Sequence, residues 1–269
     1  MITLTASKLR SFKSCPKKYF FEYIEMLKRI DTPEALSIGS SYHANLEKLL
    51  KGETLEPPTD LPGAMAEAFA RYIPWRTWDV KDVEKEFKVK LAPGIYLAGK
   101  IDALLEDGTP VEHKSSGVKA DEKYRKRLFL DDQVSCYLTA LSLIRKEPVN
   151  RIVYTVCQKP TGLRLKKGET EEELFERQRH WYDEKPEEKV TAFTVVRATE
   201  EIEEFRQELI YMGRSLQQGR KIWYRNPMAC AIGARCTFDD ICQNYDPDCL
   251  VGYVRKERES EELNGNFEW

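Results

Sequence analysis

Two apolar runs on either side of a turn signal place the tightest limit on how this chain can fold. Ile95 to Leu105 and Thr109 to Ser115 have the composition of strands, and Glu106-Asp107-Gly108 between them is typical of a hairpin turn. The two strands are therefore expected to form a β-hairpin.

The length of the turn decides which side chains meet across the hairpin. A two-residue turn pairs Asp102 with His113, whereas a three-residue loop with Gly108 in the left-handed conformation pairs Asp102 with Glu112. In the second register, the two-residue period of a strand adds Lys114 to the same face. Two adjacent carboxylates repel each other, and a Mg²⁺ or Mn²⁺ ion that relieves this repulsion can also activate water. A lysine beside them can stabilise charge that develops in a reaction, although a structural cross-strand ion pair fits the same residues.

Elsewhere the spacing of hydrophobic residues alternates between the period of helices and that of strands. The expected helices begin near Lys8, with Ser7 as the cap, and continue at 39–50, 61–72, 131–145, 169–183 and 200–218. Further strands are expected at 84–91, 151–157 and 191–196. Strands surrounded by helices predict an α/β fold with a central mixed β-sheet. We expect one domain over residues 1–269, with a helical N-terminal part (1–80), a core (81–200) and a cysteine-rich tail (226–250).

The seven cysteines divide into two groups. Their odd number, and the lack of a signal-peptide pattern at the N-terminus, argue against a disulfide framework. Cys136 and Cys157 fall in apolar elements and are expected in the core. The tail carries four thiols, in the pattern Cys230-x5-Cys236-x5-Cys242-x6-Cys249. Such wide spacing favours an iron-sulfur cluster over zinc, although zinc and free thiols stay open.

Charge is balanced overall but uneven along the chain. Lys+Arg 43 against Asp+Glu 45 leaves a net charge of -2, so a polyanion site must be local. Basic and aromatic residues are interleaved around Lys17 and Lys18 and again around Arg125 and Lys126, a pattern suited to phosphates and stacked bases. A solvated helix face is the alternative. No apolar run approaches the ~20 residues of a membrane span, so we expect a cytoplasmic location and no membrane partner.

Five motifs, in a fixed order from Leu9 to Tyr137, together resemble one enzyme family. They are Leu9-x2-Phe12-x2-Cys15-Pro16-x2-Tyr19, Gly39-x3-His43-x2-Leu46-Glu47, Gly99-Lys100-Ile101-Asp102, Val111-Glu112-His113-Lys114-Ser115 and Gln133-x3-Tyr137. The set resembles the PD-(D/E)XK nuclease superfamily, in the RecB-type exonuclease branch that includes AddB-like and CRISPR-associated iron-sulfur nucleases. The resemblance implies the restriction-endonuclease-like core of that family.

The resemblance also assigns roles to the site residues. It implies that His43, together with Asp102 and Glu112, binds the Mg²⁺ or Mn²⁺ ion, and that Lys114 takes part in catalysis. Gln133 is expected to hold the lysine or a phosphate, and Tyr137 to line the path of the strand. His43 and Glu47 lie four residues apart on one helix face.

A 4Fe-4S cluster is implied at the cysteines. In the family one ligand precedes the nuclease core and three follow it, which corresponds here to Cys15, Cys230, Cys236 and Cys242. Cys249 is a competing ligand, because the spacing from Cys230 to Cys236 departs from the family pattern. Such a cluster would staple the helical N-terminal region to the C-terminal tail.

The resulting hypothesis is a metal-dependent DNA exonuclease that acts on single strands or ends during recombination or repair of bacterial or phage DNA. The alternative is a catalytically idle nucleic-acid-binding or scaffold module for a helicase or recombination partner. Every catalytic residue type is present, which favours the enzyme.

Overall fold

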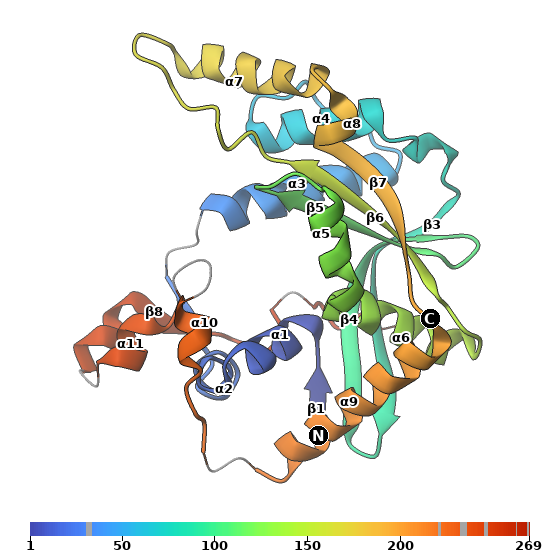
Figure 1. The fold of residues 1–269 in the computed structure, drawn as a ribbon, viewed down its shortest axis with the longest axis vertical. Coiled ribbons are helices and arrows are strands. Elements are labelled where there is room, and N and C mark those ends of the chain that lie inside the picture. The colour runs from blue at the N-terminus through green and yellow to red at the C-terminus, as the bar shows by residue number, and fades with distance from the viewer. Residues whose placement is uncertain (31–33, 220–221, 232–235, 245–246, 262, 268) are drawn as a thin grey trace.

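The computed structural model describes residues 1–30, 34–219, 222–231, 236–244, 247–261, 263–267 and 269. A six-stranded mixed sheet has the order β1-β4-β5-β6-β7, and β3 pairs with the remaining edge of β4 (Figure 1). These strands are β1 (Ile2–Leu4), β3 (Val80–Ala92), β4 (Ile95–Leu105), β5 (Pro110–Ser116), β6 (Arg151–Gln158) and β7 (Val190–Val196). The sheet is mixed because β1 and β6 run parallel to their partners, β4 and β5, whereas the other pairs are antiparallel.

Helices cover both sides of the sheet, and the two larger apolar clusters of the described residues lie beneath them. The main helices are α1 (Ala6–Ser14), α3 (Glu34–Leu50), α4 (Leu61–Tyr72), α5 (Glu122–Arg127), α6 (Asp132–Arg145), α7 (Glu171–His180), α8 (Pro186–Lys189) and α9 (Thr199–Gln217). One core lies beneath α1, α6 and α9, and the other beneath α3 and α4. The prediction of an α/β fold with a central mixed sheet flanked by helices is confirmed. No helix in the described part of the chain is long and apolar enough to cross a bilayer.

The hairpin of β4 and β5 adopts the register of the three-residue loop. Ala103 pairs with Val111, and Gly108 has a φ of 80°, the left-handed conformation that this loop requires. The regular pairing of β4 with β5 does not continue from Ala103 to Asp102. Instead, the backbone N–H of His113 donates to Asp102 Oδ2 at 2.7 Å. The carboxylate of Asp102 therefore bridges the two strands at the point where they separate.

The N-terminus differs from the sequence prediction in two ways. Ile2–Leu4 forms a strand that pairs with the start of β4, within the part expected to be helical. The cap of α1 is Thr5, whose side chain accepts a hydrogen bond from Lys8 N at 3.2 Å, so the prediction of Ser7 as the cap was wrong. Strand β1 reaches Leu4 in extended conformation, and Thr5 is the first residue that can turn the chain into the helix.

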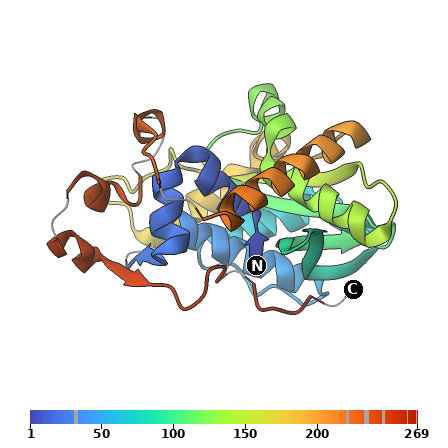
Figure 2. The same cartoon turned by 90° about the horizontal axis from the view of Figure 1, so that it is seen from below.

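The C-terminal part folds back over the N-terminal part. It contains α10 (Pro227–Ala231), α11 (Asp239–Gln243) and β8 (Tyr253–Arg255), and β8 pairs with β2 (Leu27–Arg29). The residues after β8, here called the C-terminal strap, run from Lys256 towards β3 (Figure 2). Glu259 forms an ion pair with the buried Lys8, and Glu86 on β3 accepts hydrogen bonds from the backbone N–H groups of residues 264–266.

Candidate active site

Three adjacent strands each contribute one carboxylate to the same region. Asp102 on β4 lies opposite Glu112 on β5 in the register of the hairpin. On the other edge of β4, the pairings that flank Glu84 place it opposite Asp102 from β3. A row of three acids across neighbouring strands concentrates negative charge, which a divalent cation would neutralise.

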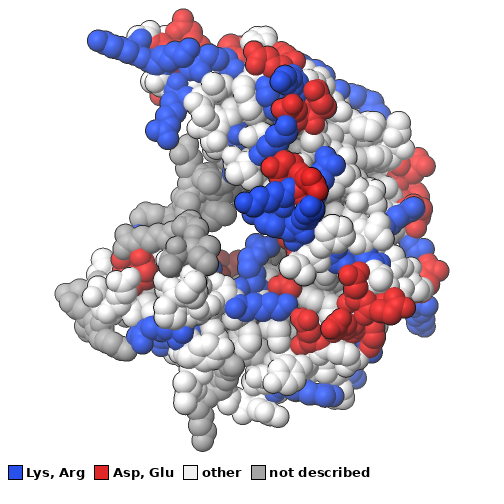
Figure 3. All heavy atoms as spheres, in the orientation of Figure 1, with Lys and Arg blue, Asp and Glu red and all other residues white. Residues whose placement is uncertain are grey.

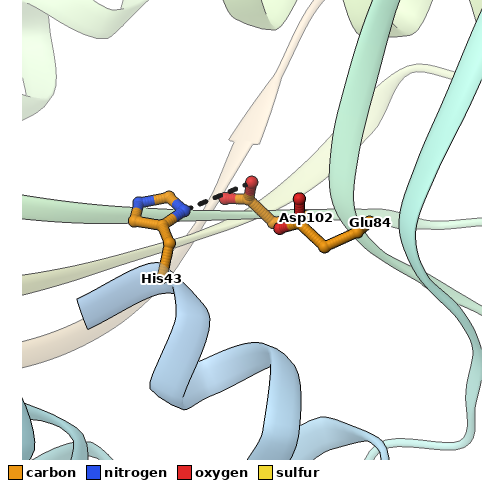
Figure 4. Close-up of side chains that lie close together, drawn as sticks. All are labelled: His43, Glu84 and Asp102. Atoms are coloured by element: carbon orange, nitrogen blue, oxygen red, sulfur yellow. Dashed lines mark ion pairs between the residues drawn. The ribbon is translucent and has the colours of Figure 1, made fainter. Parts of the chain in front are cut away.

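One histidine and two of these acids form a candidate metal site. Atoms of His43, Glu84 and Asp102 that could act as ligands all lie within 4.8 Å of one another (Figure 4). His43 projects from α3, and its Nδ1 lies 3.5 Å from Asp102 Oδ1. The structure thus brings together two predicted ligands, His43 and Asp102, and adds Glu84, which the sequence analysis missed.

The backbone at Glu84 is unusual for a strand residue. Its φ is 53°, in the left-handed region, where a side chain with a Cβ is disfavoured by about 1–2 kcal/mol. Its carboxylate forms an ion pair with Lys100 on β4. Backbone strain of this kind is concentrated at functional sites, so it supports a role for Glu84 in the site. A regular turn at Pro93-Gly94 would set Ala103 opposite Glu84, and the register shift between Lys90 and Ala92 brings Asp102 to that position instead.

The third acid, Glu112, is held in a hydrogen-bonded network with Lys114. Lys114 Nζ forms an ion pair with Glu112 Oε1 and donates to Gln133 Oε1 at 2.9 Å. Gln133 Nε2 donates to Glu112 Oε1 at 2.9 Å and to the Tyr137 hydroxyl at 2.8 Å. Tyr137 in turn donates to the carbonyl oxygen of Lys100 at 2.6 Å. This network fixes the lysine and the carboxylate from α6, where Gln133 and Tyr137 lie one turn apart.

Burial and neighbouring charges move the pKa values of the acids in opposite directions. Burial alone would raise the pKa of Asp102, but the charge and hydrogen bond of His43 lower it well below its usual range. Burial and the charge of Asp102 raise the pKa of Glu112 to about 7. Asp102 also offsets the effect of burial on His43, whose pKa is raised. A neighbouring carboxylate therefore opposes ionisation of Glu112 when no cation is present.

One oxygen of Glu112 gives a direct test of whether a cation fits. Glu112 Oε2 is buried, and nothing in the described part of the chain forms a hydrogen bond with it. A buried carboxylate oxygen without a partner is costly, and a hard cation bound beside it would satisfy it. The donor set of imidazole and carboxylates suits Mn²⁺ and Mg²⁺. The residues present therefore fit a divalent metal.

His113 faces the other side of the sheet. Its ring contacts Phe69 and Trp78, and its Nδ1 lies 2.7 Å from Thr155 Oγ1. Burial lowers the pKa of His113 to about 4, so the imidazole is neutral. This placement agrees with the three-residue register, which separates His113 from Glu112 and Lys114. His180 is exposed and pairs with Asp183.

The four cysteines named as cluster ligands line one pocket. The pocket has a volume of about 820 Å³ and is lined by residues that include Cys15, Cys230, Cys236 and Cys242. Cys15 lies between α1 and α2 (Pro16–Tyr19), more than 200 residues from the other three. Cys249 is absent from the described lining of this pocket.

Hydrogen-bond donors point at two of these sulfur atoms. Arg225 Nε donates to Cys242 Sγ at 3.3 Å, and the backbone N–H of Asn226 donates to Cys15 Sγ at 3.4 Å. Such donors stabilise thiolates and metal-bound sulfur. Cys136 and Cys157 are fully buried, as predicted for core residues.

The predicted nucleic-acid-binding lysines and arginines lie in different surroundings. Lys17 Nζ lies over the rings of Phe20 and Phe21, at 4.4 and 4.7 Å from their centroids, and Lys18 lines the cysteine pocket. Arg125 lies 4.7 Å over the ring of Phe193, and Lys126 is exposed and pairs with Glu122. The structure therefore separates the two basic segments and gives Lys18 a place beside the cysteines.

Comparisons with known proteins identify the class. A sequence model described as the PD-(D/E)XK nuclease superfamily matches residues 3–243. None of the curated proteins matches the sequence. A solved structure of a putative exonuclease from Eubacterium rectale has a TM-score of 0.56 and 12% sequence identity, over 98% of this chain and 94% of that chain. A phage related exonuclease from Haemophilus somnus 129PT has a TM-score of 0.41 and 11% identity, over 81% and 94%.

The family match spans most of the chain and coincides with the structural site. The chain belongs to the PD-(D/E)XK nuclease superfamily, and its class is that of nuclease hydrolases that use divalent metals. The Eubacterium rectale structure supports the same fold. The predicted superfamily is thereby confirmed.

Proposed function

We propose that the protein is a Mg²⁺- or Mn²⁺-dependent DNA exonuclease of the RecB-type branch, acting on single strands or ends. The observation that carries this proposal is the row of acids from β3, β4 and β5, with one buried oxygen of Glu112 lacking a partner beside Lys114. A purely structural ion pair would satisfy both oxygens of a buried carboxylate. The biological context that we propose is recombination or repair of bacterial or phage DNA.

Each residue has a part in this proposal. His43, Asp102 and Glu112 hold the metal, and Glu84 completes the set on the side of β3. A bound ion supplies a water of lowered pKa and neutralises charge on the phosphate. Lys114, oriented by Gln133 Oε1, stabilises the charge that develops on the scissile phosphate. Tyr137 positions Gln133 through their hydrogen bond.

The direct test is cleavage of end-labelled DNA. The wild-type protein with Mn²⁺ should shorten linear single strands progressively, and EDTA should stop the reaction. Circular single-stranded DNA should resist cleavage, because an exonuclease needs an end. Cleavage of the circle would contradict the exonuclease assignment while keeping the nuclease. Absence of cleavage with any divalent metal would favour the idle binding module for a helicase partner.

We also propose that the cysteine pocket holds a 4Fe-4S cluster bound by Cys15, Cys230, Cys236 and Cys242. The shared pocket supports this ligand set over one that contains Cys249. Lys18 and the donors of Arg225 and Asn226 suit a group with net negative charge. The cluster joins two distant parts of the chain and has a structural role.

A further inference from the structure

The loop after β6 begins at the same edge of the sheet as the candidate catalytic lysine. Strands β5 and β6 are parallel, so Ser116 pairs with Gln158, and Lys159 N donates to Ser116 O at 2.7 Å. Lys114 lies only two residues before Ser116. Residues 159–183, here called the arm, therefore leave the sheet beside the site.

Hydrogen bonds between residues of the arm hold its loop in a defined conformation. Glu169 accepts two hydrogen bonds from the guanidinium of Arg177, both at 2.8 Å, and one from the backbone N–H of Lys166 at 2.7 Å. Arg177 also donates to the carbonyl oxygen of Arg164 at 2.9 Å. Since these contacts use the backbone of the loop, they leave the side chains of Arg164 and Lys166 free to project.

The arm is also anchored to the layer that carries His43. Arg179 donates to both carboxylate oxygens of Glu67 on α4, at 2.6 and 2.7 Å. Asp183 accepts hydrogen bonds from Arg71 at 2.6 Å and from Tyr72 at 2.8 Å. Helix α4 packs against α3, and this packing sets the position of the arm relative to the site.

Three cations of the loop have no acidic partner among the described residues. Residues 159–168 contain basic side chains and no acidic one. Arg164, Lys166 and Lys167 are exposed and form no ion pair with the described residues. Figure 3 shows Lys and Arg side chains at the end of the arm. It also shows them on the side of the arm that faces the concave part of the surface. Beside them lies a pocket of about 680 Å³, whose lining includes Arg164, Lys166 and Trp181.

We propose that the arm is a second binding surface for the substrate strand, outside the catalytic centre. Arg164, Lys166 and Lys167 bind phosphates, and the pocket beside Trp181 accepts a base, the combination that single-strand binding sites use. The inference rests on the proposed nuclease function. A nucleic acid is favoured over an acidic protein because the loop starts at the sheet edge that carries Lys114.

The test compares two triple variants that lose the same charge. Arg164→Ala/Lys166→Ala/Lys167→Ala removes the arm cations, and Lys90→Ala/Lys146→Ala/Arg214→Ala removes exposed cations without described partners elsewhere. Binding of a fluorescent 30-nucleotide oligo-dT is measured in EDTA from 50 to 200 mM salt. Each phosphate contact on a single strand contributes about 0.7 to the salt slope, so the arm variant should lower it by about 2 and weaken binding about tenfold. The control variant should stay within about twofold of wild type.

Cleavage with Mn²⁺ separates this inference from the proposed function. The arm variant should raise KM for cleavage and leave kcat unchanged. In the binding measurement, Lys167→Glu alone should weaken binding more than Lys167→Ala. Binding equal to wild type, or a fall in kcat at constant KM, would overturn the role of the arm. A wild-type protein that binds the oligonucleotide through the arm but cuts no DNA would overturn the nuclease function alone.

Discussion

Asp102 and Cys236 each belong to a candidate ligand site, but the chain around them is built in different ways. Asp102 lies in the middle of the sheet, where strand pairing, a hydrogen bond from His113 N and the ion pair with His43 fix its carboxylate. Cys236 lies between two five-residue helices and lines a pocket of about 820 Å³. Strand pairing and polar contacts within the chain therefore hold the candidate catalytic region, whereas the cysteine region surrounds space that a ligand would fill.

This difference predicts that ligand loss has different consequences in the two regions. Removing a catalytic acid should abolish chemistry and leave the fold intact. Removing a cluster ligand should unfold the C-terminal region first and affect chemistry only through that change.

The largest effect is expected for Asp102→Asn. A metal ion provides several kcal/mol of transition-state stabilisation, so cleavage should fall about 1,000-fold. Although burial opposes ionisation, His43 lowers the pKa of Asp102 in the folded state, so the midpoint of thermal unfolding should fall slightly at neutral pH without metal. Steady-state cleavage and circular dichroism measure the two quantities. Asp107→Asn, the same change at an exposed position of the same hairpin, is the control and should retain activity.

The next effect is on the stability of the cysteine region. Cys236→Ala should lose iron and acid-labile sulfide, and the free energy of unfolding should fall by about 2–4 kcal/mol, as for loss of a covalent cross-link. Limited proteolysis should then cut both near Cys15 and after residue 222. Cys249→Ala is the matched control and should keep its iron. Iron loss in Cys249→Ala with a harmless Cys15→Ala would instead place a local metal site in the tail.

Metal binding should stabilise the catalytic region by a measurable amount. At a free Mn²⁺ concentration 100 times Kd, linkage predicts about 2.7 kcal/mol of stabilisation of the wild-type protein. Glu84→Gln should reduce this gain by more than half, while the exposed Glu106→Gln should retain it. Thermal unfolding with and without Mn²⁺ measures the gain. A full gain in Glu84→Gln would limit Glu84 to its ion pair with Lys100.

The smallest effect is expected at the network that orients Lys114. Gln133→Ala removes hydrogen bonds to Lys114 and Glu112, and a loss of about 1.4 kcal/mol would lower kcat about tenfold. KM should change little, since Gln133 acts through the lysine. Gln207→Ala on the exposed face of α9 is the control. An unchanged kcat would show that Lys114 needs no support from α6.

The sequence predicted Asp102 and Glu112 as site residues but not Glu84. The composition of the turn at residues 106–108 was enough to consider a register that sets Asp102 opposite Glu112, and the left-handed Gly108 is part of that register. Glu84 was missed because its side chain reaches Asp102 through an unusual φ, which no local pattern predicts. Its strand was predicted, but a register shift between Lys90 and Ala92 decides which residue of β4 lies opposite Glu84.

The contacts of the C-terminal strap could not be predicted from the sequence, for a different reason. Its backbone N–H groups at residues 264–266 are satisfied by the carboxylate of Glu86, and Lys8 is buried against Glu259. These partners are far apart in the chain, so periodicity and turn signals carry no information about them. By contrast, the gathering of Cys15 with the tail cysteines was expected from the family resemblance alone.

The central claim is that the row of acids binds the catalytic metal. Crystals grown with Mn²⁺ and measured for anomalous scattering test it directly. We predict a strong anomalous peak in contact with His43, Glu84 and Asp102, with Glu112 Oε2 turned towards the ion or towards a second one. A protein that cleaves DNA with Mn²⁺ but shows its anomalous peak elsewhere, or none at this row of acids, would contradict the account.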